Sequence, residues 1–388
     1  MVLVINGVKV KTLSGPVSFL ILKPVDKVKS FPSIILLGDY HNSDKHQCES
    51  CESGDCYAIY SKRFLSLIDS PNVDFYVENW VDRADKSEEY FKYMKEHHNY
   101  PLELIREEII ACYYKELRGK KIYNKYCPTK NIRWHLSDPR YAVNSYEHFL
   151  SIIEMEFLKK LKKDITKGAI DEQIISKIIK RHYNKDYKLF IDSLKTMKLM
   201  LDYKNPEAFV DHYFSSDNNY FLNNSLVYKQ LKKQLNQFYY WKRNFMVYYK
   251  TVIIPFSIKT AFYNDKVSID DVIDTYNRIL YLIETNNIRE LKTINIEHIK
   301  RLTLYMVALC SCFLDMYFVL RNFKYQETGV ITKLSLGYFG DAHVDNITIL
   351  LTNILKLYTV SGKTDTKKVE KNDYNKCLEL PDIFLVSN

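Results

Sequence analysis

Short apolar runs that stop at polar residues are the feature that most constrains the fold of this chain. Two of these runs are followed at once by the same motif, Gly-Asp-x-His, at residues 38–41 and 340–343. The 388 residues include only 10 Gly and 10 His, so two copies of the motif behind two apolar runs indicate a shared role. The runs with the length and composition of strands are Val17–Leu22, Ser33–Leu37, Val73–Val77, Ile132–Leu136 and Lys333–Phe339.

Helical patterns alternate with the apolar runs in the first 140 residues. Tyr57–Asp69 and Lys86–Arg118 carry Leu, Ile, Tyr and Phe at helical spacing. The chain starts with a β-hairpin pattern that turns at Asn6-Gly7. Strands and helices in alternation are typical of an α/β fold, with a mostly parallel sheet and flanking helices.

Residues 141–325 have a different pattern, of long amphipathic segments with almost no Gly, and we predict a large all-α insertion there. The apolar run Tyr305–Leu320 is interrupted by Asp315 and predicts a buried helix. The other helix candidates of this region are Ser145–Lys167, Asp171–Leu201 and Ser268–Thr285.

The strand pattern returns near the end of the chain. We therefore predict one sheet domain from residues 1–140 and 326–388, interrupted by a helical insertion or subdomain at 141–325. The segments that follow the last Gly-Asp-x-His motif are predicted as a helix, a polar loop and a strand, at Asn346–Tyr358, Ser361–Asp373 and Asp382–Val386.

Polar side chains follow four of the predicted strands. They are Asp39 and His41, Glu78, Arg140, and Asp341 and His343. Because the carboxyl ends of parallel strands form the edge where ligands bind, we expect these side chains to converge. Imidazole and carboxylate together bind divalent metals. A Glu or His can also deprotonate water, and an Arg can hold an anionic substrate or a developing oxyanion.

A purely structural interpretation of the same residues is open as well. Asp39 and Asp341 can cap loops, and Glu78 can pair with Arg140 as a buried couple. We favour a shared functional site, because both motifs stand directly behind an apolar run. The Gly that opens each motif is expected to let the backbone leave the strand in a conformation that other residues resist.

The order of Gly-x-x-His, a Glu after a strand, an Arg and a second Gly-x-x-His resembles the TIKI/TraB, ChaN-like and erythromycin esterase-like superfamily. The resemblance covers roughly residues 30–140 and 330–350. It implies an α/β sheet with the motifs at one edge, in a group of metal-dependent proteases, esterases and haem-binding proteins. The site residues that it implies are His41, Glu78, Arg140 and His343, with His41, Glu78 and His343 as ligands of a divalent metal ion.

Cysteines cluster directly after the first motif. Cys48 and Cys51 have the Cys-x2-Cys spacing that places two thiolates on one turn of a tetrahedral metal site, and Cys56 supplies a third ligand. The fourth ligand is left open among His46, Cys112 and Cys127. This pattern predicts a structural zinc site, with free thiols or a redox pair as alternatives. Because no export signal is visible, we expect the eight cysteines to be reduced thiols or metal ligands and not a disulfide framework.

Charge and motif content narrow the function classes. The net charge of +9 is partly concentrated in the Lys-rich stretches 159–163 and 177–188. Such stretches can attract nucleic acid, but we favour a solvated helix face. No run approaches the roughly 20 apolar residues that span a bilayer. A P-loop, a dinucleotide fingerprint and a Gly-x-Ser-x-Gly elbow are all missing from the sequence, which disfavours nucleotide-dependent transfer and ordinary serine-hydrolase chemistry.

The leading hypothesis is a cytoplasmic, metal-assisted or His/Glu-assisted hydrolase of the TIKI/TraB–erythromycin esterase type, acting on a peptide or an ester. His41 and His343 would be metal ligands or bases, Glu78 the acid/base and Arg140 the anion clamp. Asp39 and Asp341 would belong to the same site. The composition also resembles uncharacterised proteins of giant DNA viruses, which would place the chain in a host cytoplasm or a virion. The alternatives are a non-enzymatic structural or host-interaction protein that keeps the fold, and a nucleic-acid-binding protein that uses the basic helices.

Overall fold

The computed structural model divides the chain into two compact units, Met1–Pro139 with Leu314–Asn388, and Arg140–Phe313. The structure describes the following residues: 3–5, 7–25, 31–40, 48, 51, 53–78, 105, 129–137, 239–261, 311–323, 332–366, 368–370, 373–374, 377–380, 385–386 and a few positions between 271 and 309. The predicted helices at Lys86–Arg118, Ser145–Lys167 and Asp171–Leu201 lie almost wholly outside this part of the chain, so the all-α insertion stays a prediction.

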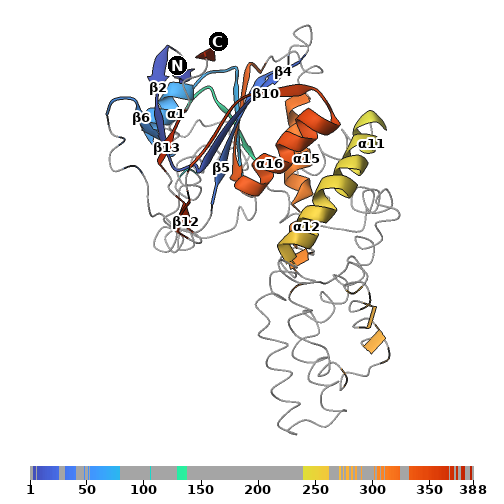
Figure 1. Cartoon of the computed structure of the whole chain (residues 1–388). Coiled ribbons are helices and arrows are strands. Elements are labelled where there is room, and N and C mark those ends of the chain that lie inside the picture. The colour runs from blue at the N-terminus through green and yellow to red at the C-terminus, as the bar shows by residue number, and fades with distance from the viewer. Residues whose placement is uncertain are drawn as a thin grey trace, which may run out of the picture. The chain divides into compact units, whose positions relative to one another are not determined.

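A six-stranded sheet with the order β10-β4-β5-β9-β7-β8 is the centre of the first unit (Figure 1). The strands β5, β9, β7 and β8 are parallel to one another. Strand β4 pairs antiparallel with both β5 and β10, so it is the one strand of this sheet that runs in the opposite direction. The sequence prediction of an α/β fold with a mostly parallel sheet is therefore confirmed. The strand bounds are β4 Ser18–Pro24, β5 Ser33–Asp39, β7 Val73–Val77, β8 Arg133–Leu136, β9 Leu334–Gly340 and β10 Tyr358–Asp365.

Strand β9 lies between β5 and β7, although it is far from both in the sequence. Its register sets Leu334 beside Ser33 of β5 and beside Val73 of β7. All seven residues of β9 are buried, as expected for a strand that is covered on both faces. At the carboxyl end of this pairing, Gly340 of the second motif stands beside Asp39 of the first. The two motifs therefore meet at one edge of the sheet.

One face of the sheet is covered by α1 (Lys62–Ile68) and by two small sheets. Helix α1 begins after Ser61, whose hydroxyl accepts a hydrogen bond from the backbone N–H of Phe64 at 3.2 Å. The small sheets have the orders β14-β1-β2 and β13-β3-β6. Their strands are β1 Leu3–Ile5, β2 Val8–Val10, β14 Leu385–Val386, β3 Thr12–Ser14, β6 Cys56–Ala58 and β13 Cys377–Glu379, and a separate pair is β11 Lys368–Glu370 with β12 Asp373–Tyr374.

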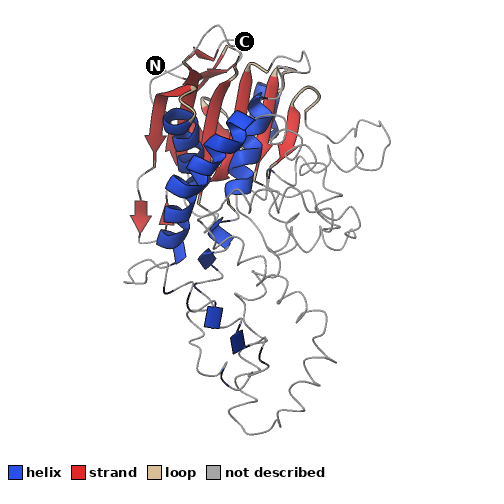
Figure 2. Cartoon of the chain, turned by 90° about the vertical axis from the view of Figure 1, so that its right-hand side faces the viewer, coloured by secondary structure: helices blue, strands red, loops and turns tan. Residues whose placement is uncertain are grey.

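The opposite face of the sheet packs against α15 (Cys312–Phe323) and α16 (Asp341–Ile349), which is continued by a π-helical turn, η5 (Leu350–Ile354) (Figure 2). The ring of Phe318 on α15 meets Tyr76 of β7 and Phe339 of β9 edge to face, with centroid distances of 4.8 and 5.3 Å. These contacts fix α15 over the carboxyl half of the parallel strands.

Several segments differ from the sequence prediction. The helix expected from Asn346 already begins at Asp341, so the second Gly-Asp-x-His motif forms its first turn. The polar loop predicted at Ser361–Asp373 is wrong for most of its length, because Lys368–Glu370 and Asp373 belong to β11 and β12, and Ser361–Asp365 belongs to β10. This edge strand leaves much of its surface in solvent, and polar residues therefore occupy it. The first residues of the predicted helix Tyr57–Asp69 belong to β6.

The predicted hairpin at the start of the chain is confirmed, since β1 and β2 pair antiparallel around Gly7 with its positive φ of 80°. The predicted buried helix at Tyr305–Leu320 is confirmed for its described residues, most of which are helical and buried. In the second unit, α11 (Tyr239–Tyr248), η2 (Tyr249–Ile253) and α12 (Ile254–Ala261) form one continuous helical segment.

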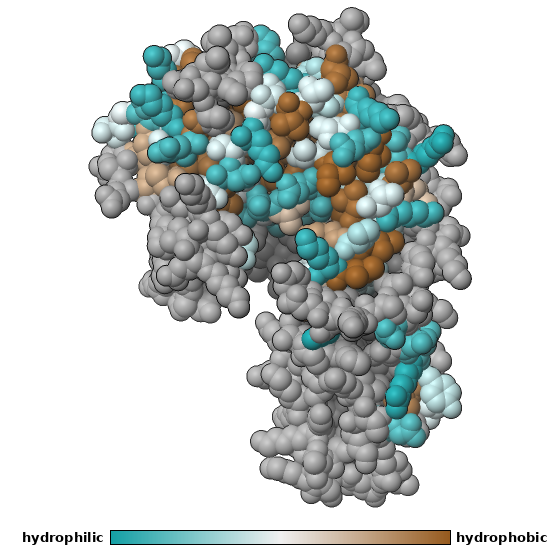
Figure 3. Space-filling view, viewed as in Figure 1, coloured by the Kyte–Doolittle hydropathy of each residue, from teal (hydrophilic) through white to brown (hydrophobic). Residues whose placement is uncertain are grey.

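Hydrophobic surface is scattered over the described residues. On the face shown in Figure 3, hydrophobic side chains of the first unit lie among hydrophilic ones. The large apolar side chains that are exposed belong to Val8, Val25, Val247, Tyr281 and Val360. No helix in the described part of the chain is long and apolar enough to cross a membrane.

Candidate functional site

A buried histidine, His343, lies between two carboxylates at the carboxyl edge of the parallel strands. It stands in the first turn of α16, and its Nδ1 is 2.7 Å from Oδ1 of Asp315 on α15. The other ring nitrogen, Nε2, is 3.5 Å from Oε1 of Glu78, which directly follows β7. His343 is 6% exposed and Asp315 fully buried, so water screens neither contact. The three side chains form a line Asp315–His343–Glu78.

Glu78 is held in place by the strand ends. Its backbone N–H donates to the carbonyl oxygen of Tyr338 on β9 at 3.0 Å. Its Oε2 accepts a hydrogen bond from the backbone N–H of Gly340 at 2.6 Å, at the start of α16. A carboxylate is favourable there, because the first N–H groups of a helix point outward with a partial positive charge. One oxygen of Glu78 therefore fixes the start of the helix, and the other faces His343.

The electrostatics of the site favour a charged imidazole in the metal-free protein. Burial alone would lower the pKa of His343, but the carboxylates of Asp315 and Glu78 outweigh it and raise the pKa from 6.5 to about 10. At neutral pH, the imidazolium therefore balances part of the negative charge of its two neighbours.

The two Asp residues of the motifs lie at neighbouring strand ends. Asp39 is buried at the end of β5, and Asp341 opens α16 beside it. The carboxylate of Asp341 accepts a hydrogen bond from Ser18 of β4. Burial raises the pKa of Asp341, with the charges of Asp345 and Asp365 in support and the hydrogen bond from Ser18 in opposition. The edge thus gathers Asp39, Glu78, Asp341 and His343 from three adjacent strand ends.

The glycine of the first motif is required for close approach, not for an unusual φ. A Cβ on Gly38 would overlap Oγ of Ser18 and Oδ1 of Asp341, and would come within 3.2 Å of the Cα of Asp341. The φ of Gly340 is −54°, and Gly38 has no positive φ either. The sequence expectation of a backbone conformation that other residues resist is therefore wrong for both motif glycines.

Part of the predicted site lies outside the described residues. The prediction named His41 and Arg140 beside Glu78 and His343, and the structure describes neither of them. Their convergence on the site stays a prediction. The structure does bring together Glu78 and His343 with Asp39 and Asp341 at the sheet edge.

Asp315 is the site residue that the sequence analysis missed. The signal was present, because Asp315 is a lone carboxylate in an otherwise apolar run, and a buried carboxylate needs a partner. The motif search did not find it, because α15 carries no Gly-Asp-x-His pattern and the partner, His343, follows only 28 residues later on another helix.

A second buried carboxylate, Asp74, lies near the amino end of the same strands. It accepts hydrogen bonds from Arg133 at 2.6 Å and Thr332 at 2.8 Å, and His135 lies 3.2 Å away. Burial is the largest influence on His135 and lowers its pKa. Because ligands bind at the carboxyl ends of parallel strands, we interpret this satisfied network as structural.

The cysteine cluster differs from the expectation of reduced thiols. The structure joins Cys48 to Cys377 and Cys51 to Cys56 through their sulfur atoms. The Sγ atoms of Cys48, Cys51 and Cys56 also lie within 4.8 Å of one another, close enough to share a metal ion. The other candidates for a fourth ligand, His46, Cys112 and Cys127, lie outside the described residues.

Comparison of the chain with protein-family models, with curated proteins and with solved structures found no match.

We predict that Asp315→Asn lowers the pKa of His343 in metal-free protein, because the amide removes one of the two charges that raise it. An NMR titration of the imidazole measures this pKa.

The raised pKa of His343 also adds stability that is complete below pH 6.5 and is lost as the pH rises through about 10. The fall in the free energy of unfolding between these two pH values should thus be smaller in Asp315→Asn. Asp345→Asn, at an exposed position of α16, is the control. An unchanged His343 titration in Asp315→Asn would contradict the assignment.

We also predict that Gly38→Ala destabilises the first unit by roughly 1–3 kcal/mol, the usual cost of overfilling a packed site. The added Cβ has to displace Ser18 and Asp341. Chemical denaturation measures the loss, and Ser66→Ala on the exposed side of α1 is the control. The double variant Gly38→Ala/Ser18→Ala should be more stable than the sum of the two single changes predicts. Strict additivity would show that the contact is absent.

Proposed function

We propose that the protein is a metal-assisted hydrolase and that Glu78 and His343 are two of the ligands of a divalent metal ion. The observation that carries this proposal is the orientation of His343. Asp315 engages Nδ1 of the ring and thereby directs Nε2 toward Glu78. Histidines that bind metals usually donate their other ring N–H to a carboxylate in this way, which fixes the tautomer and the ring plane.

The donor atoms fit a divalent ion. With metal–ligand distances of about 2.0–2.2 Å, two ligands of one tetrahedral ion are separated by roughly 3.3–3.6 Å. The separation of 3.5 Å between Nε2 of His343 and Oε1 of Glu78 is near that value and long for a hydrogen bond. Neutral imidazole and carboxylate are common ligands of zinc, manganese and iron. A divalent ion would also balance the negative charge that Glu78 and Asp315 bring into a buried site.

Each described residue has a separate task in this proposal. A bound metal would lower the pKa of a water molecule or polarise the bond to be cleaved. Asp315 holds the His343 ring, and the Gly340 N–H holds the Glu78 carboxylate, so neither ligand has to reorganise. Asp39 is a buried carboxylate at the end of β5. The half-buried carboxyl of Asp341, whose pKa is raised by burial, can accept or return a proton. His41 would be a further ligand and Arg140 the group that holds an anionic substrate or oxyanion.

The substrate class follows from the motif resemblance and remains part of the proposal. The TIKI/TraB–erythromycin esterase group that the motifs resemble includes metal-dependent proteases and esterases, so we propose a peptide or an ester. The competing function is a non-enzymatic structural or host-interaction protein. It has support from the same contacts, since a His343 imidazolium between two carboxylates is also a stable structural element.

Metal binding separates the two functions. We predict that Glu78→Gln lowers the affinity for Mn²⁺, Co²⁺ or Zn²⁺ in calorimetric titration and abolishes metal-stimulated cleavage of a panel of peptides and esters. The glutamine oxygen still accepts the Gly340 N–H, so the helix start is kept. Asp315→Asn, which removes the support of His343, should lower the affinity about 10–100-fold. The control is Asp345→Asn, and a Cys48→Ser/Cys51→Ser background removes binding at the cysteine cluster.

The structural interpretation predicts the opposite pattern. In that case, His343→Ala would leave Glu78 and Asp315 buried without their cation, and the loss of stability would be about 3–5 kcal/mol. Chelator would then leave the thermal unfolding of the Cys48→Ser/Cys51→Ser protein unchanged. If the Cys48→Ser/Cys51→Ser protein and its folded Glu78→Gln variant bind the metal with equal affinity, the proposed site is refuted.

A further inference from the structure

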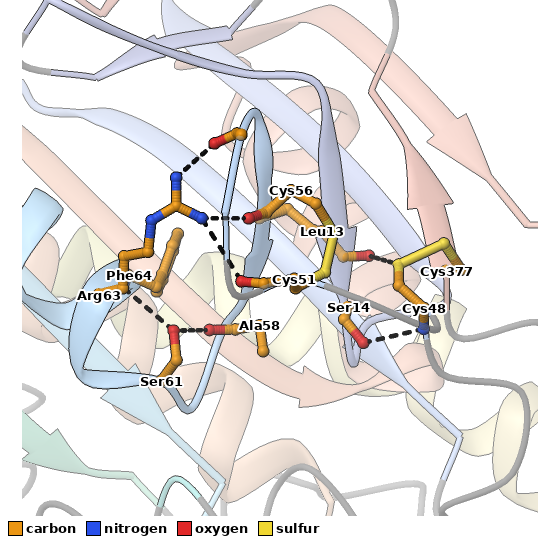
Figure 4. Close-up of a disulfide and its surroundings, with 11 residues drawn as sticks. Leu13, Ser14, Cys48, Cys51, Cys56, Ala58, Ser61, Arg63, Phe64 and Cys377 are labelled. Carbon is orange, nitrogen blue, oxygen red and sulfur yellow. Dashed lines mark hydrogen bonds between the residues drawn. A yellow bond between two sulfur atoms is a disulfide. The ribbon is translucent and has the colours of Figure 1, made fainter.

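Four cysteines meet beside the small sheet β13-β3-β6 (Figure 4). Cys48 and Cys51 stand between β5 and β6 in the sequence, Cys56 is the first residue of β6, and Cys377 is the first residue of β13. The sulfur of Cys377 is joined to that of Cys48, although the two residues are 329 positions apart. Since the sulfurs of Cys48, Cys51 and Cys56 lie within 4.8 Å of one another, all four thiol positions gather in one place.

The register of the small sheet explains this meeting. Strand β3 is central, with Cys56 opposite Thr12 on one side and Cys377 opposite Ser14 on the other. Residues two apart on a strand point to the same face, so Cys56 and Cys377 flank β3 on one face. Cys48 is tied to that face as well, because its backbone N–H donates to Oγ of Ser14 at 3.2 Å. The backbone pairing therefore positions Cys56 and Cys377 independently of any link between their sulfurs.

Arg63 on α1 shapes the turn that carries two of the cysteines. Its guanidinium donates to the carbonyl oxygens of Cys51 at 3.4 Å and of Cys56 at 2.9 Å, and also to that of Gly54. It stacks over the Tyr57 ring, 4.0 Å from its centroid. Gly54 has a φ of 69°, which most other residues resist, so the turn is built into the sequence.

We infer that Cys48, Cys51, Cys56 and Cys377, when reduced, form a four-thiolate site for Zn²⁺. A tetrahedral metal site requires four sulfurs around one point, and the four cysteine sulfurs meet here beside one strand. The Cys-x2-Cys spacing of Cys48 and Cys51 is typical of such sites. Cys377 takes the place of the fourth ligand, which the sequence analysis sought in His46, Cys112 or Cys127.

The two disulfides and the proposed metal site use the same four sulfur atoms. Two molecules of a small thiol reduce each disulfide by supplying two electrons and two protons. The small thiols leave as one disulfide, and the protein keeps two cysteine thiols. The four thiols then release their protons as they bind Zn²⁺. The metal would tie β13 to the segment that follows the first Gly-Asp-x-His motif. This inference does not depend on the proposed hydrolase activity.

The test is the zinc content of the full chain, purified with reductant and without chelator, in a Glu78→Gln background that weakens the other proposed metal site. We expect one Zn²⁺ per chain by elemental analysis. Cys377→Ser should bind Zn²⁺ at least tenfold more weakly, and Cys377→His should restore binding, because a three-cysteine, one-histidine set is also competent. Cys312→Ser is the control, because Cys312 is a buried cysteine of α15 outside both disulfides and should not affect the metal.

A spectroscopic readout keeps the test decisive if Cys377→Ser fails to fold. Replacing Zn²⁺ by Co²⁺ should give the thiolate-to-cobalt charge transfer and the intense visible bands of a tetrahedral four-sulfur site. Zinc content that is equal in the parent chain and in folded Cys377→Ser would overturn the assignment of Cys377. A metal-free chain whose mass rises by four hydrogens on reduction would show two disulfides in place of the site.

Discussion

The backbone hydrogen bonds of β9 are the interaction on which the rest of the first unit depends. This strand, Leu334–Gly340, fills the space between β5 and β7, which would otherwise be two separate edges. Its register with Ser33–Asp39 places Gly340 beside Asp39, and its pairing with β7 places the Tyr338 carbonyl opposite the Glu78 N–H. The position of α16, and so of His343, follows directly from where β9 ends.

Next to this sheet, buried carboxylates lie beside side chains that are positively charged or donate hydrogen bonds to them. Asp315 and Glu78 both approach His343, and Asp74 is matched in the same way by Arg133, His135 and Thr332. The two networks lie at opposite ends of the strands. Asp74 receives its donors near the amino end. At the carboxyl end, Nε2 of His343 and Oε1 of Glu78 stand 3.5 Å apart, where we propose the metal ion.

The sequence was sufficient for the strands that are buried on both faces. Val73–Val77 agrees with β7 residue for residue, and the runs before each motif agree with β5 and β9 to within two residues. Their continuous apolar composition leaves little ambiguity. The edge strand β10 was predicted largely as loop, because a strand with an exposed face has a mixed composition that a short window cannot separate from a polar loop. Helix α16 was placed five residues late, since Asp and Gly at its start resemble the end of a strand.

Only the site residues that directly follow a strand could be predicted from the sequence. Glu78, His343 and the two motif Asp residues share a rule, that polar groups follow strands. Asp315 and Cys377 obey no such rule, because they come from a helix and a short edge strand with their own sequence context. Only the fold brings them to their partners, across 28 residues to His343 and 329 residues to Cys48.

The late position of β9 in the chain has a consequence for biosynthesis. During translation, β5 and β7 leave the ribosome about 260 residues or more before the strand that separates them, at typical rates of about 5–20 residues per second. Both strands are almost entirely apolar and present unpaired backbone groups until β9 arrives. Contacts between such distant segments also form slowly, because a long loop has to close first. The sheet can therefore be completed only after β9 has been synthesised. Until then its unpaired strands carry a risk of aggregation, and chaperones would have their main effect on the yield of native protein during that period.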